Sequence, residues 1–409
     1  MSIFSSSMKK RSVLIKNRSF LHTTYIPDQL PHRENEITNI VEIITPSLNK
    51  NKPSNILVIG KTGTGKTAVL NYIGRELKKE DSTEENCSFL YVNCEIVDNP
   101  YGILFNISNQ IIKDHNNKIP FTGWSLDKVY DTIINYIESE SKIFIIVLDE
   151  IDKILQKSGD DIFYFLTTMN EVLTDSKISI IGVTNNTKFI ELLSPKIKSR
   201  LGEEKVVFPP YDSEQLESIL KRRAELAFES GVIEEGVISL CAGMSAKDSG
   251  DARKALDLLR VSAEIAERNG DSLITEAHVR SAWNEMEKDA VQEVIRTLPD
   301  QSKMVLMSCI TAHENKKNVS VITGDVYSVY KDICNSMYTV PLKEKRVTDL
   351  ISELDMLGII HARVKSFGRN GRTREIDINV NKDTIEFIKK DELFEPLRKH
   401  KPAKQTTLL

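Results

Sequence analysis

The phosphate-binding pattern at residues 60–67 constrains the fold of this chain more than any other stretch of its sequence. The segment reads GKTGTGKT and fits GxxxxGK(S/T), directly after the apolar run NILVIG and before the helical pattern AVLNYIGREL. Glycines let backbone N–H groups turn toward phosphates, and the start of the following helix adds positive potential. An ordinary glycine-rich turn is the alternative, and four matching positions in this context disfavour it. The predicted nucleotide-binding loop consists of Gly60, Lys61, Thr62, Gly63, Thr64, Gly65, Lys66 and Thr67.

Other apolar runs are similar to the one before this loop. Residues 89–94, 143–150 and 178–186 are short and rich in β-branched side chains, as buried parallel strands are. Helical patterns lie between them, and in residues 126–137 the apolar side chains fall on one face. Alternating strands and helices predict a layered α/β domain with a parallel sheet.

Polar side chains at the ends of two runs complete the predicted site. Asp149 and Glu150 close the most apolar run, which places two carboxylates at the edge where parallel sheets bind ligands. With Lys66 on the β- and γ-phosphates, Thr67 and Asp149 would hold Mg²⁺, and Glu150 would orient the attacking water. Asn185, after the next run, would reach the same water or the γ-phosphate. The alternatives are a charged pair that merely stops a strand and a turn asparagine.

Two arginines are candidates to neutralise charge in the transition state. Arg253 lies at the start of a helical pattern after the α/β region and would act within the chain. Arg200, in KIKSRLGEEKVVFPP, would act on the nucleotide of a neighbouring subunit. As single residues, both are also compatible with solvated surface arginines.

The patterning divides the chain into five parts. Residues 1–24 are polar and basic without periodicity, which predicts a mobile or extended arm before a nucleotide-binding core at 25–211. Consecutive amphipathic helices predict a helical lid over 212–290. At 291–395 three helical patterns precede two strand-like runs around an Asn-Gly turn, which predicts a winged helix. Residues 396–409 are typical of a polar tail.

Basic residues gather in the predicted winged helix. Residues 291–409 contain 20 lysines and arginines against 16 acidic residues, although the whole chain has a formal charge of −4. The ribbon at 361–374 has no acidic residue, and its cations would contact phosphates or a minor groove while the preceding helix enters a major groove. A solvated hairpin or a protein-binding wing is the alternative. The candidate DNA-binding residues are Lys343, Lys345, Arg346, Arg363, Lys365, Arg369, Arg372 and Arg374.

Cysteine usage and hydropathy indicate the compartment. The five cysteines are widely spaced, without CxxC or zinc-spaced histidines, so we expect a reducing compartment and no structural metal. The first residues have no apolar core of signal-peptide length, and no run of about 18 apolar residues follows. We therefore expect a soluble intracellular protein that does not enter membranes.

Several longer motifs occur in the order of a known family. NILVIGKTGTGKT, VLDEID, GVTNNTKF, LGEEKVVFPPYDSEQLESIL and SGDARKALDLLRVSAEIAE span most of the chain, and a winged-helix-like region ending LDMLGII follows. Together they resemble the AAA+ DNA-replication initiators of the origin-recognition and cell-division-cycle type (Orc/Cdc), in the compact archaeal form. The resemblance implies the roles given above for the loop and the acidic pair, and it makes Asn185 and Arg253 the first and second nucleotide sensors.

Three further expectations rest on the resemblance. Residues 97–124 match a helical insertion with which initiators touch duplex DNA, and an ordinary packing helix is the alternative. Many archaeal members have an arginine where Lys196 stands, which leaves open whether Arg200 or the lysine is the inter-subunit finger. YIPDQLPHRENEI is similar to the family's segment around the adenine. The added nucleotide-binding residues are Tyr25, Ile26, Arg33 and Tyr211.

The implied function is ATP-dependent initiation of DNA replication. The implied cofactors are ATP or ADP with Mg²⁺, and the implied partners are duplex origin DNA, an MCM-type replicative helicase and other initiator subunits. Slow hydrolysis of ATP to ADP would be the switch. A signalling or transcription ATPase whose winged helix is an interaction module is the alternative, and a clamp-loader-like motor leaves the winged helix unexplained. Basic residues on both the wing and the preceding helix favour the initiator.

Overall fold

The structure is a computed structural model that describes residues 14–97, 99–113, 118–316, 320–366 and 372–399. The chain divides into two compact units, Met1–Ala282 and Trp283–Leu409, each with its own hydrophobic core. The predicted fold class is confirmed. A parallel-sheet domain and a helical lid form the first unit, and a winged helix lies in the second.

A five-stranded parallel sheet lies at the centre of the first unit. Its strands are β1 (Ile56–Gly60), β2 (Cys87–Asn93), β3 (Ile143–Asp149), β4 (Lys177–Thr184) and β5 (Glu204–Phe208), in the order β2-β3-β4-β1-β5. Every residue of β1 and β3 is buried, which is why both strands read as continuous apolar runs. The predicted runs correspond to the first four strands. β5 is absent from the prediction because this edge strand alternates exposed and buried residues over only one short stretch.

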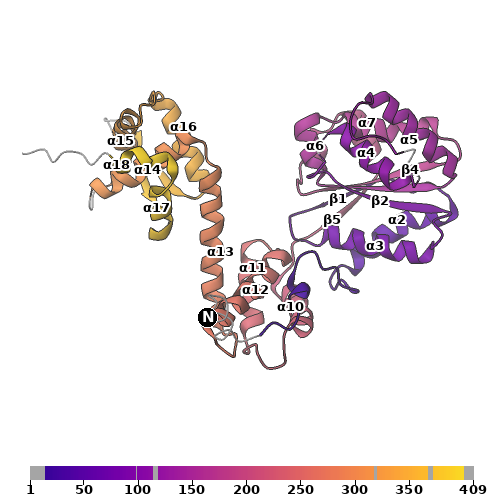
Figure 1. Ribbon diagram of the computed structural model, residues 1–409, viewed down its shortest axis with the longest axis horizontal. Coiled ribbons are helices and arrows are strands. Elements are labelled where there is room, and N and C mark those ends of the chain that lie inside the picture. The colour runs from indigo at the N-terminus through magenta and orange to yellow at the C-terminus, as the bar shows by residue number, and fades with distance from the viewer. Residues whose placement is uncertain (1–13, 98, 114–117, 317–319, 367–371, 400–409) are drawn as a thin grey trace, which may run out of the picture. The chain divides into compact units, whose positions relative to one another are not determined.

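Helices cover both faces of this sheet (Figure 1). On one face lie α2 (Glu34–Ile44) and α3 (Lys66–Glu80), and on the other lie α4 (Pro100–Ile111), α5 (Leu126–Glu140) and α7 (Asp161–Val172). Alternate side chains of β3 belong to the two cores, so the sheet is a buried layer between helices. The shorter helices of the second face are α6 (Ile151–Ser158), α8 (Phe189–Leu192) and α9 (Pro195–Leu201).

The strand register brings the predicted polar residues to one edge of the sheet. Ile59 near the end of β1 lies opposite Thr184 at the end of β4, and Asn93 at the end of β2 lies opposite Asp149. The carboxyl ends of the parallel strands therefore meet where the loop after β1 begins.

A bundle of three helices forms most of the lid. It contains α10 (Ser213–Ala227), α11 (Val237–Asp248) and α12 (Ala252–Asn269). Asp212 caps α10 in a capping box, and the Asp251 side chain accepts hydrogen bonds from the first backbone N–H groups of α12. These carboxylates fix where the two helices begin.

Residues 14–24 correct the prediction of a mobile or extended arm. Leu14 and Ile15 are buried against the lid, and their N–H groups donate to the Glu267 carboxylate of α12 at 3.0 and 3.1 Å. The short helix η1 (Arg18–Leu21) follows and contacts α10 and α12. Helical or strand periodicity cannot reveal this docking, because a few apolar residues stand among polar ones. The rest of the predicted arm lies outside the described residues.

Three helices build the core of the second unit, as predicted. They are α14 (Asp300–Asn315), α15 (Thr323–Ser336) and α16 (Glu344–Met356). The helix α13 (Glu276–Thr297) contains the predicted boundary between lid and winged helix, so that boundary falls within a helix and not in a linker.

An antiparallel sheet completes the winged helix. Its strands are β6 (Val321–Ile322), β7 (Ile360–Ser366) and β8 (Arg372–Ile378), in the order β6-β8-β7. The Asn-Gly turn predicted between β7 and β8 lies outside the described residues. β6 is only two residues long, too short for a sequence pattern to reveal.

The end of the described chain is helical. α17 (Lys382–Lys389) and α18 (Glu395–Lys399) follow the sheet, and Leu397 packs against the core. The predicted polar tail from residue 396 is therefore wrong up to Lys399, because one apolar side chain finds a contact. Among the described residues, no helix is both long enough and apolar enough to cross a membrane.

Candidate functional site

At two positions of the loop between β1 and α3, only glycine fits. Gly63 and Gly65 have φ angles of +71° and +90°, in the left-handed region that favours glycine. A Cβ on Gly63 would lie 1.6 Å from Oδ1 of Asp251 in the lid, and one on Gly65 would lie 2.7 Å from the Tyr211 hydroxyl. The Ala252 N–H of the lid also donates to the Gly63 carbonyl at 3.1 Å. The loop is thus shaped by its backbone and held against the lid.

Lys66 lies among oxygen atoms at the start of α3. Its ammonium donates to the carbonyls of Gly60 and Lys61 at 2.9 and 2.8 Å and to Oδ1 of Asn185 at 2.6 Å. Burial lowers the pKa of Lys66, and the positive charge of Arg253 acts in the same direction, while the nearby carboxylates oppose them. The ammonium is therefore fixed beside the loop, where phosphate oxygens can replace its present acceptors.

Asp149 and Thr67 present adjacent oxygen atoms. The Thr67 hydroxyl donates to Oδ2 of Asp149 at 2.8 Å, and the Glu150 N–H donates to Oδ1 at 2.9 Å. A hydroxyl and a carboxylate are ligands that Mg²⁺ prefers, so this pair fits the ion. Among the described residues, no cluster of three or more His, Cys, Asp or Glu side chains is arranged to hold a metal by protein ligands alone. Phosphate and water would supply the other ligands.

Tyr91 is a site residue that the sequence did not reveal. Its hydroxyl, on β2, donates to the same Oδ2 of Asp149 that accepts from Thr67. Burial raises the pKa of Tyr91, and the negative charge of Asp149 raises it further, so the phenol stays protonated and remains a donor. The tyrosine thereby fixes the direction of the carboxylate. A tyrosine inside an apolar strand carries no local signal, because the pairing of β2 with β3 is what brings it to Asp149.

Glu150 and Asn185 form the second half of the site. The Asn185 amide donates to both carboxylate oxygens of Glu150 at 2.7 Å, while its own oxygen accepts from Lys66. Burial raises the pKa of Glu150, the Asn185 hydrogen bonds oppose that shift, and Asp149 adds to it. Glu150 also has a φ of +58°, an uncommon conformation for a non-glycine residue that turns the chain out of β3 into α6. The three side chains form one hydrogen-bonded chain, Lys66–Asn185–Glu150.

Arg33 supports the loop through the backbone. Its side chain is buried and donates from Nε to the Thr64 carbonyl at 2.9 Å and from Nη2 to the Pro209 carbonyl at 2.7 Å. The guanidinium also donates to Glu36 and lies 3.9 Å from the centre of the Tyr211 ring. Arg33 was predicted as a nucleotide contact, whereas in the structure its donors are engaged with protein atoms beside the loop.

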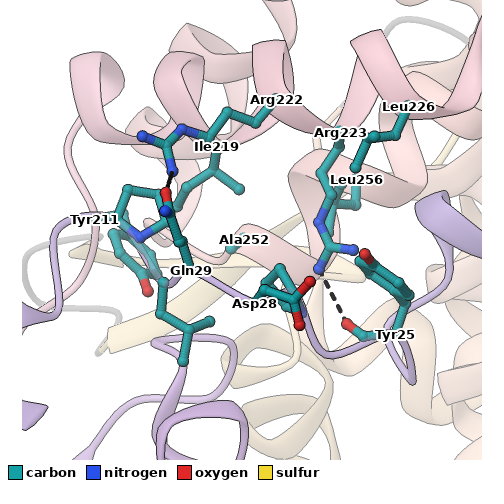
Figure 2. A pocket seen from close by; sticks show the side chains of 13 residues that line it. Tyr25, Asp28, Gln29, Tyr211, Ile219, Arg222, Arg223, Leu226, Ala252 and Leu256 are labelled. Carbon is teal, nitrogen blue, oxygen red and sulfur yellow. Dashed lines mark hydrogen bonds between the residues drawn. The ribbon is translucent and has the colours of Figure 1, made fainter. Parts of the chain in front are cut away.

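A cavity of about 310 Å³ is lined by Tyr211 and Ala252 (Figure 2), and both of these residues also meet the glycines of the loop. Its walls also include Tyr25, residues 27–31 and side chains of the lid helices α10 and α12, whereas Ile26, a predicted nucleotide contact, does not line it. The buried Arg223 of the lid donates to the Tyr25 carbonyl at 3.0 Å and lies over the Tyr25 ring, as Figure 2 shows. Aromatic and aliphatic walls beside a phosphate loop suit a flat heterocycle such as a nucleotide base.

The two predicted transition-state arginines lie in different places. Arg253, in the first turn of α12, is exposed, and its charge acts on Lys66. Arg200, on α9, pairs with Glu171 of α7 at 2.5 Å. Lys196, on the same helix, lies over the ring of Tyr164 on α7. The structure thus brings Arg253 near the site, while Arg200 and Lys196 lie together on the α7–α9 surface.

The predicted DNA-binding side chains that the structure describes lie on α16, at its start, and on the strands β7 and β8. Lys343, Lys345 and Arg346 are exposed where α16 begins, and Arg363 is exposed on β7. Arg374 on β8 is half-buried and donates to the Ser352 hydroxyl of α16, so it joins the strand to the helix. The side chains of Lys365, Arg369 and Arg372 lie outside the described residues.

The segment expected to be a DNA-contacting insertion contains α4. That helix packs against the sheet through Ile103, Leu104 and Ile107, as the packing alternative expects. Beyond it, Phe121 is 72% exposed and meets Phe105 edge to face. Residues 98 and 114–117 of the segment lie outside the described residues.

Three parts of the chain match families of known proteins. Residues 56–209 match the ATPase family associated with various cellular activities (AAA), and residues 217–284 match the Cdc6 AAA+ ATPase-type lid domain. Residues 293–388 match the CDC6 C-terminal winged helix domain.

Similar proteins and structures cover nearly the whole chain. The ORC1-type DNA replication proteins of Thermococcus onnurineus and Pyrococcus abyssi are 47% and 48% identical, over 95% and 97% of this chain and 93% and 94% of theirs. The structure of the Aeropyrum pernix Orc1 protein in complex with DNA is 40% identical, with a TM-score of 0.78, and the match covers 94% of this chain and 99% of that one. Cdc6p from Pyrobaculum aerophilum, 23% identical over 95% of this chain and 99% of that one, with a TM-score of 0.58, shares the fold.

Proposed function

The chain belongs to the Cdc6 and ORC1-type family of AAA+ DNA replication proteins, and from this premise we propose that it is an ATP-dependent replication initiator. In this role it binds duplex origin DNA and helps to recruit or load an MCM-type helicase, and ATP hydrolysis resets it. Full-length similarity to ORC1-type replication proteins, and to an Orc1 protein solved with DNA, supports this choice over a transcription ATPase.

The hydrogen-bonded chain Lys66–Asn185–Glu150 is the observation that carries the ATPase part of the proposal. Lys66 binds the β- and γ-phosphates in place of its present carbonyl acceptors. Glu150 accepts a proton from the attacking water, and its raised pKa makes its carboxylate a stronger base. Asn185 keeps that carboxylate aimed while it contacts Lys66. Arg253, whose charge already acts on Lys66, neutralises the charge that develops on the phosphates.

Thr67 and Asp149 would hold Mg²⁺ in this site. The ion, when bound, neutralises phosphate charge. Tyr91 holds the Asp149 carboxylate in the direction of Thr67, which prepares the pair before any ion arrives. Tyr25 and Tyr211, which both line the adjoining cavity, would surround the base.

The cations at the start of α16 and on β7 carry the DNA part of the proposal. Lys343 is the N-cap of the helix that a winged helix places in a groove, Lys345 and Arg346 lie in its first turn, and all three are exposed. Arg374 ties β8 to this helix, so Arg363 on the neighbouring strand has a fixed position relative to it. Lys365, Arg369 and Arg372 would extend the same basic ribbon.

Slow hydrolysis suits a switch, because the DNA-bound state and not the flux of product is the output. Other initiator subunits would meet the α7–α9 surface, where Arg200 or Lys196 would reach a neighbour's nucleotide. The protein would act in the cytoplasm, on the nucleoid.

The variant Glu150→Gln tests the switch. We expect it to bind ATP as the wild type does and to lose at least about 100-fold in hydrolysis rate, because the general base is removed and the shape is kept. Nucleotide titration and phosphate release measure the two quantities. The exposed Glu229→Gln, which makes the same charge change on the lid, should leave both unchanged. Equal rates of ATP hydrolysis in Glu150→Gln and the wild type would show that Glu150 is not the general base.

Genome-wide mapping of the bound DNA tests the initiator role itself. A few sharp peaks at replication origins, stronger in Glu150→Gln because the ATP state persists, are the expected result. Peaks spread over promoters would contradict it and support a transcription ATPase.

A further inference from the structure

The turn between α15 and α16 exposes two large apolar side chains. Tyr338 is 91% exposed and Val340 is 83% exposed, which makes them the two most exposed large apolar side chains among the described residues. Exposing the apolar surface of a tyrosine ring and a valine side chain to water costs free energy, and no packing within the described part of the fold offsets that cost.

The backbone of the turn does not need these side chains. The N–H groups of Met337, Tyr338 and Thr339 donate to carbonyls in the last turns of α15 at 3.0, 3.2 and 2.9 Å. Buried Tyr330 accepts from the Leu342 N–H through its hydroxyl at 3.2 Å, which closes the turn from the other side. The shape of the turn is therefore set by the main chain and by Tyr330.

Tyr338 also has an unfavourable backbone conformation. Its φ is +53°, which costs an L residue about 1 kcal/mol and costs glycine nothing. The same unit has a glycine, Gly358 with φ +70°, where α16 ends and the chain again turns left-handed. A tyrosine at position 338 is thus disfavoured both by its backbone and by its exposure, and an outlier of this kind points to a contact outside the fold.

The charges beside the turn indicate what that contact is. Lys343, Lys345 and Arg346 are exposed just after it, against one acidic residue, Glu344, in the same stretch, and the positive end of the α16 dipole adds to them. A phosphate-bearing partner that also presents apolar groups fits both features. In duplex DNA the phosphates lie beside deoxyribose carbons and thymine methyl groups.

We propose that Tyr338 and Val340 contact apolar groups of duplex DNA while the adjacent cations contact its phosphates. The inference rests on the proposed DNA-binding function and adds two residues that carry no charge. The apolar groups are deoxyribose carbons or thymine methyl groups.

The test compares stability with DNA affinity in the full-length chain. Tyr338→Gly should unfold at the same temperature as the wild type or a higher one, because the strained φ is relieved. Its affinity for a fluorescently labelled mixed-sequence duplex should fall about tenfold. Tyr338→Asn, which also tolerates a positive φ, should behave alike. Met356→Ala, equally exposed at the other end of α16, is the matched control and should change neither quantity.

The salt dependence separates this contact from the ionic ones. Tyr338→Gly should leave the slope of log affinity against log salt unchanged, since no counterion is involved. Lys343→Ala with Lys345→Ala should reduce the slope by about 2. If only the lysine variant binds DNA more weakly, the proposal for Tyr338 is wrong, but the proposed DNA-binding role of the α16 cations is supported. If neither variant binds more weakly, the DNA surface at α16 is wrong as well. A lower unfolding temperature in both Tyr338 variants would assign the ring to the fold and overturn the proposal.

A duplex in which deoxyuridine replaces thymidine identifies the apolar group. It lacks only the thymine methyl groups. Weaker wild-type binding to it, with no such loss in Tyr338→Gly, assigns the contact to those methyl groups. Equal wild-type binding, together with the loss in Tyr338→Gly on both duplexes, assigns it to deoxyribose.

Discussion

At the scale of single residues, Arg33 is a buried side chain that holds the phosphate loop through its backbone. It is almost fully buried, and its fork of donors joins the Thr64 carbonyl in the loop to the Pro209 carbonyl after β5. A guanidinium can make both bonds and lie on the Tyr211 ring, and an ammonium cannot. Arg33 is therefore a positioning residue for the loop.

Arg33→Lys should weaken ATP binding about tenfold and lower the free energy of unfolding by about 2 kcal/mol, because the buried Thr64 carbonyl and the Pro209 carbonyl lose the guanidinium donors. Nucleotide titration and urea unfolding measure the two effects. Arg280→Lys, at an exposed helical position, is the control and should match the wild type. Unchanged ATP affinity in Arg33→Lys would show that the loop keeps its shape without the fork.

Whether a site residue was predictable depended on where its partner lies in the sequence. The loop and the acidic pair were predictable because each is a local pattern beside a strand. The contact of Tyr91 with Asp149 and the bridge from Asn185 to Lys66 depend on the order of strands in the sheet, which no local pattern contains. For Arg33, sequence suggested a place near the nucleotide but not the direction of its donors.

At the scale of elements, the turn from α3 to β2 is held by one carboxylate. Asp81 is buried and accepts from the backbone N–H groups of Glu85, Asn86 and Cys87, at 3.3, 2.9 and 2.9 Å. Burial acts to raise the pKa of Asp81, but the three N–H groups outweigh it, so the pKa lies below its usual value. The ionised carboxylate therefore stabilises the fold.

Asp81→Asn should lower the free energy of unfolding by about 2 kcal/mol at neutral pH. Because the folded pKa is the lower one, the contribution is complete above the unfolded pKa of about 3.9 and is lost as the pH falls through the folded value. The difference between variant and wild type should therefore shrink below about pH 4, as urea unfolding across pH would show. The exposed Glu80→Gln is the control. A difference that does not depend on pH would mean that shape and not charge holds the turn.

Long, strongly patterned elements were predictable, and short or half-exposed ones were not. Continuous apolar runs predict the central strands, and periodic apolar residues predict the lid helices. β5 and β6 lack such a run, and residues 14–24 dock through three buried apolar side chains, Leu14, Ile15 and Leu21, and a distant glutamate. These elements exist only because the rest of the fold offers them a partner.

At the scale of the whole molecule, the proposed nucleotide site and the proposed DNA site at α16 belong to different compact units. The phosphate loop and the lid lie in the first unit, and α16 with its cations lies in the second. Each unit has its own buried core. A ligand of one unit should therefore stabilise that unit alone.

Calorimetry of the full chain should show two unfolding transitions. Mg²⁺ with ATP at about 100 times its Kd should stabilise the first unit by about 2.7 kcal/mol and leave the other transition in place. Lys66→Ala should abolish that shift, while Lys343→Ala should not. A single transition that moves as a whole with ATP would show that the two units unfold together.

The docking of residues 14–24 on the lid has a consequence for folding during synthesis. The segment is translated before its partners on α10 and α12, which follow about 200 to 250 residues later, on the order of ten to fifty seconds at ordinary synthesis rates. During that time Leu14 and Ile15 have no surface to cover them. Residues 14–24 are thus among the last parts of their unit to find their place, although they are translated before most of it.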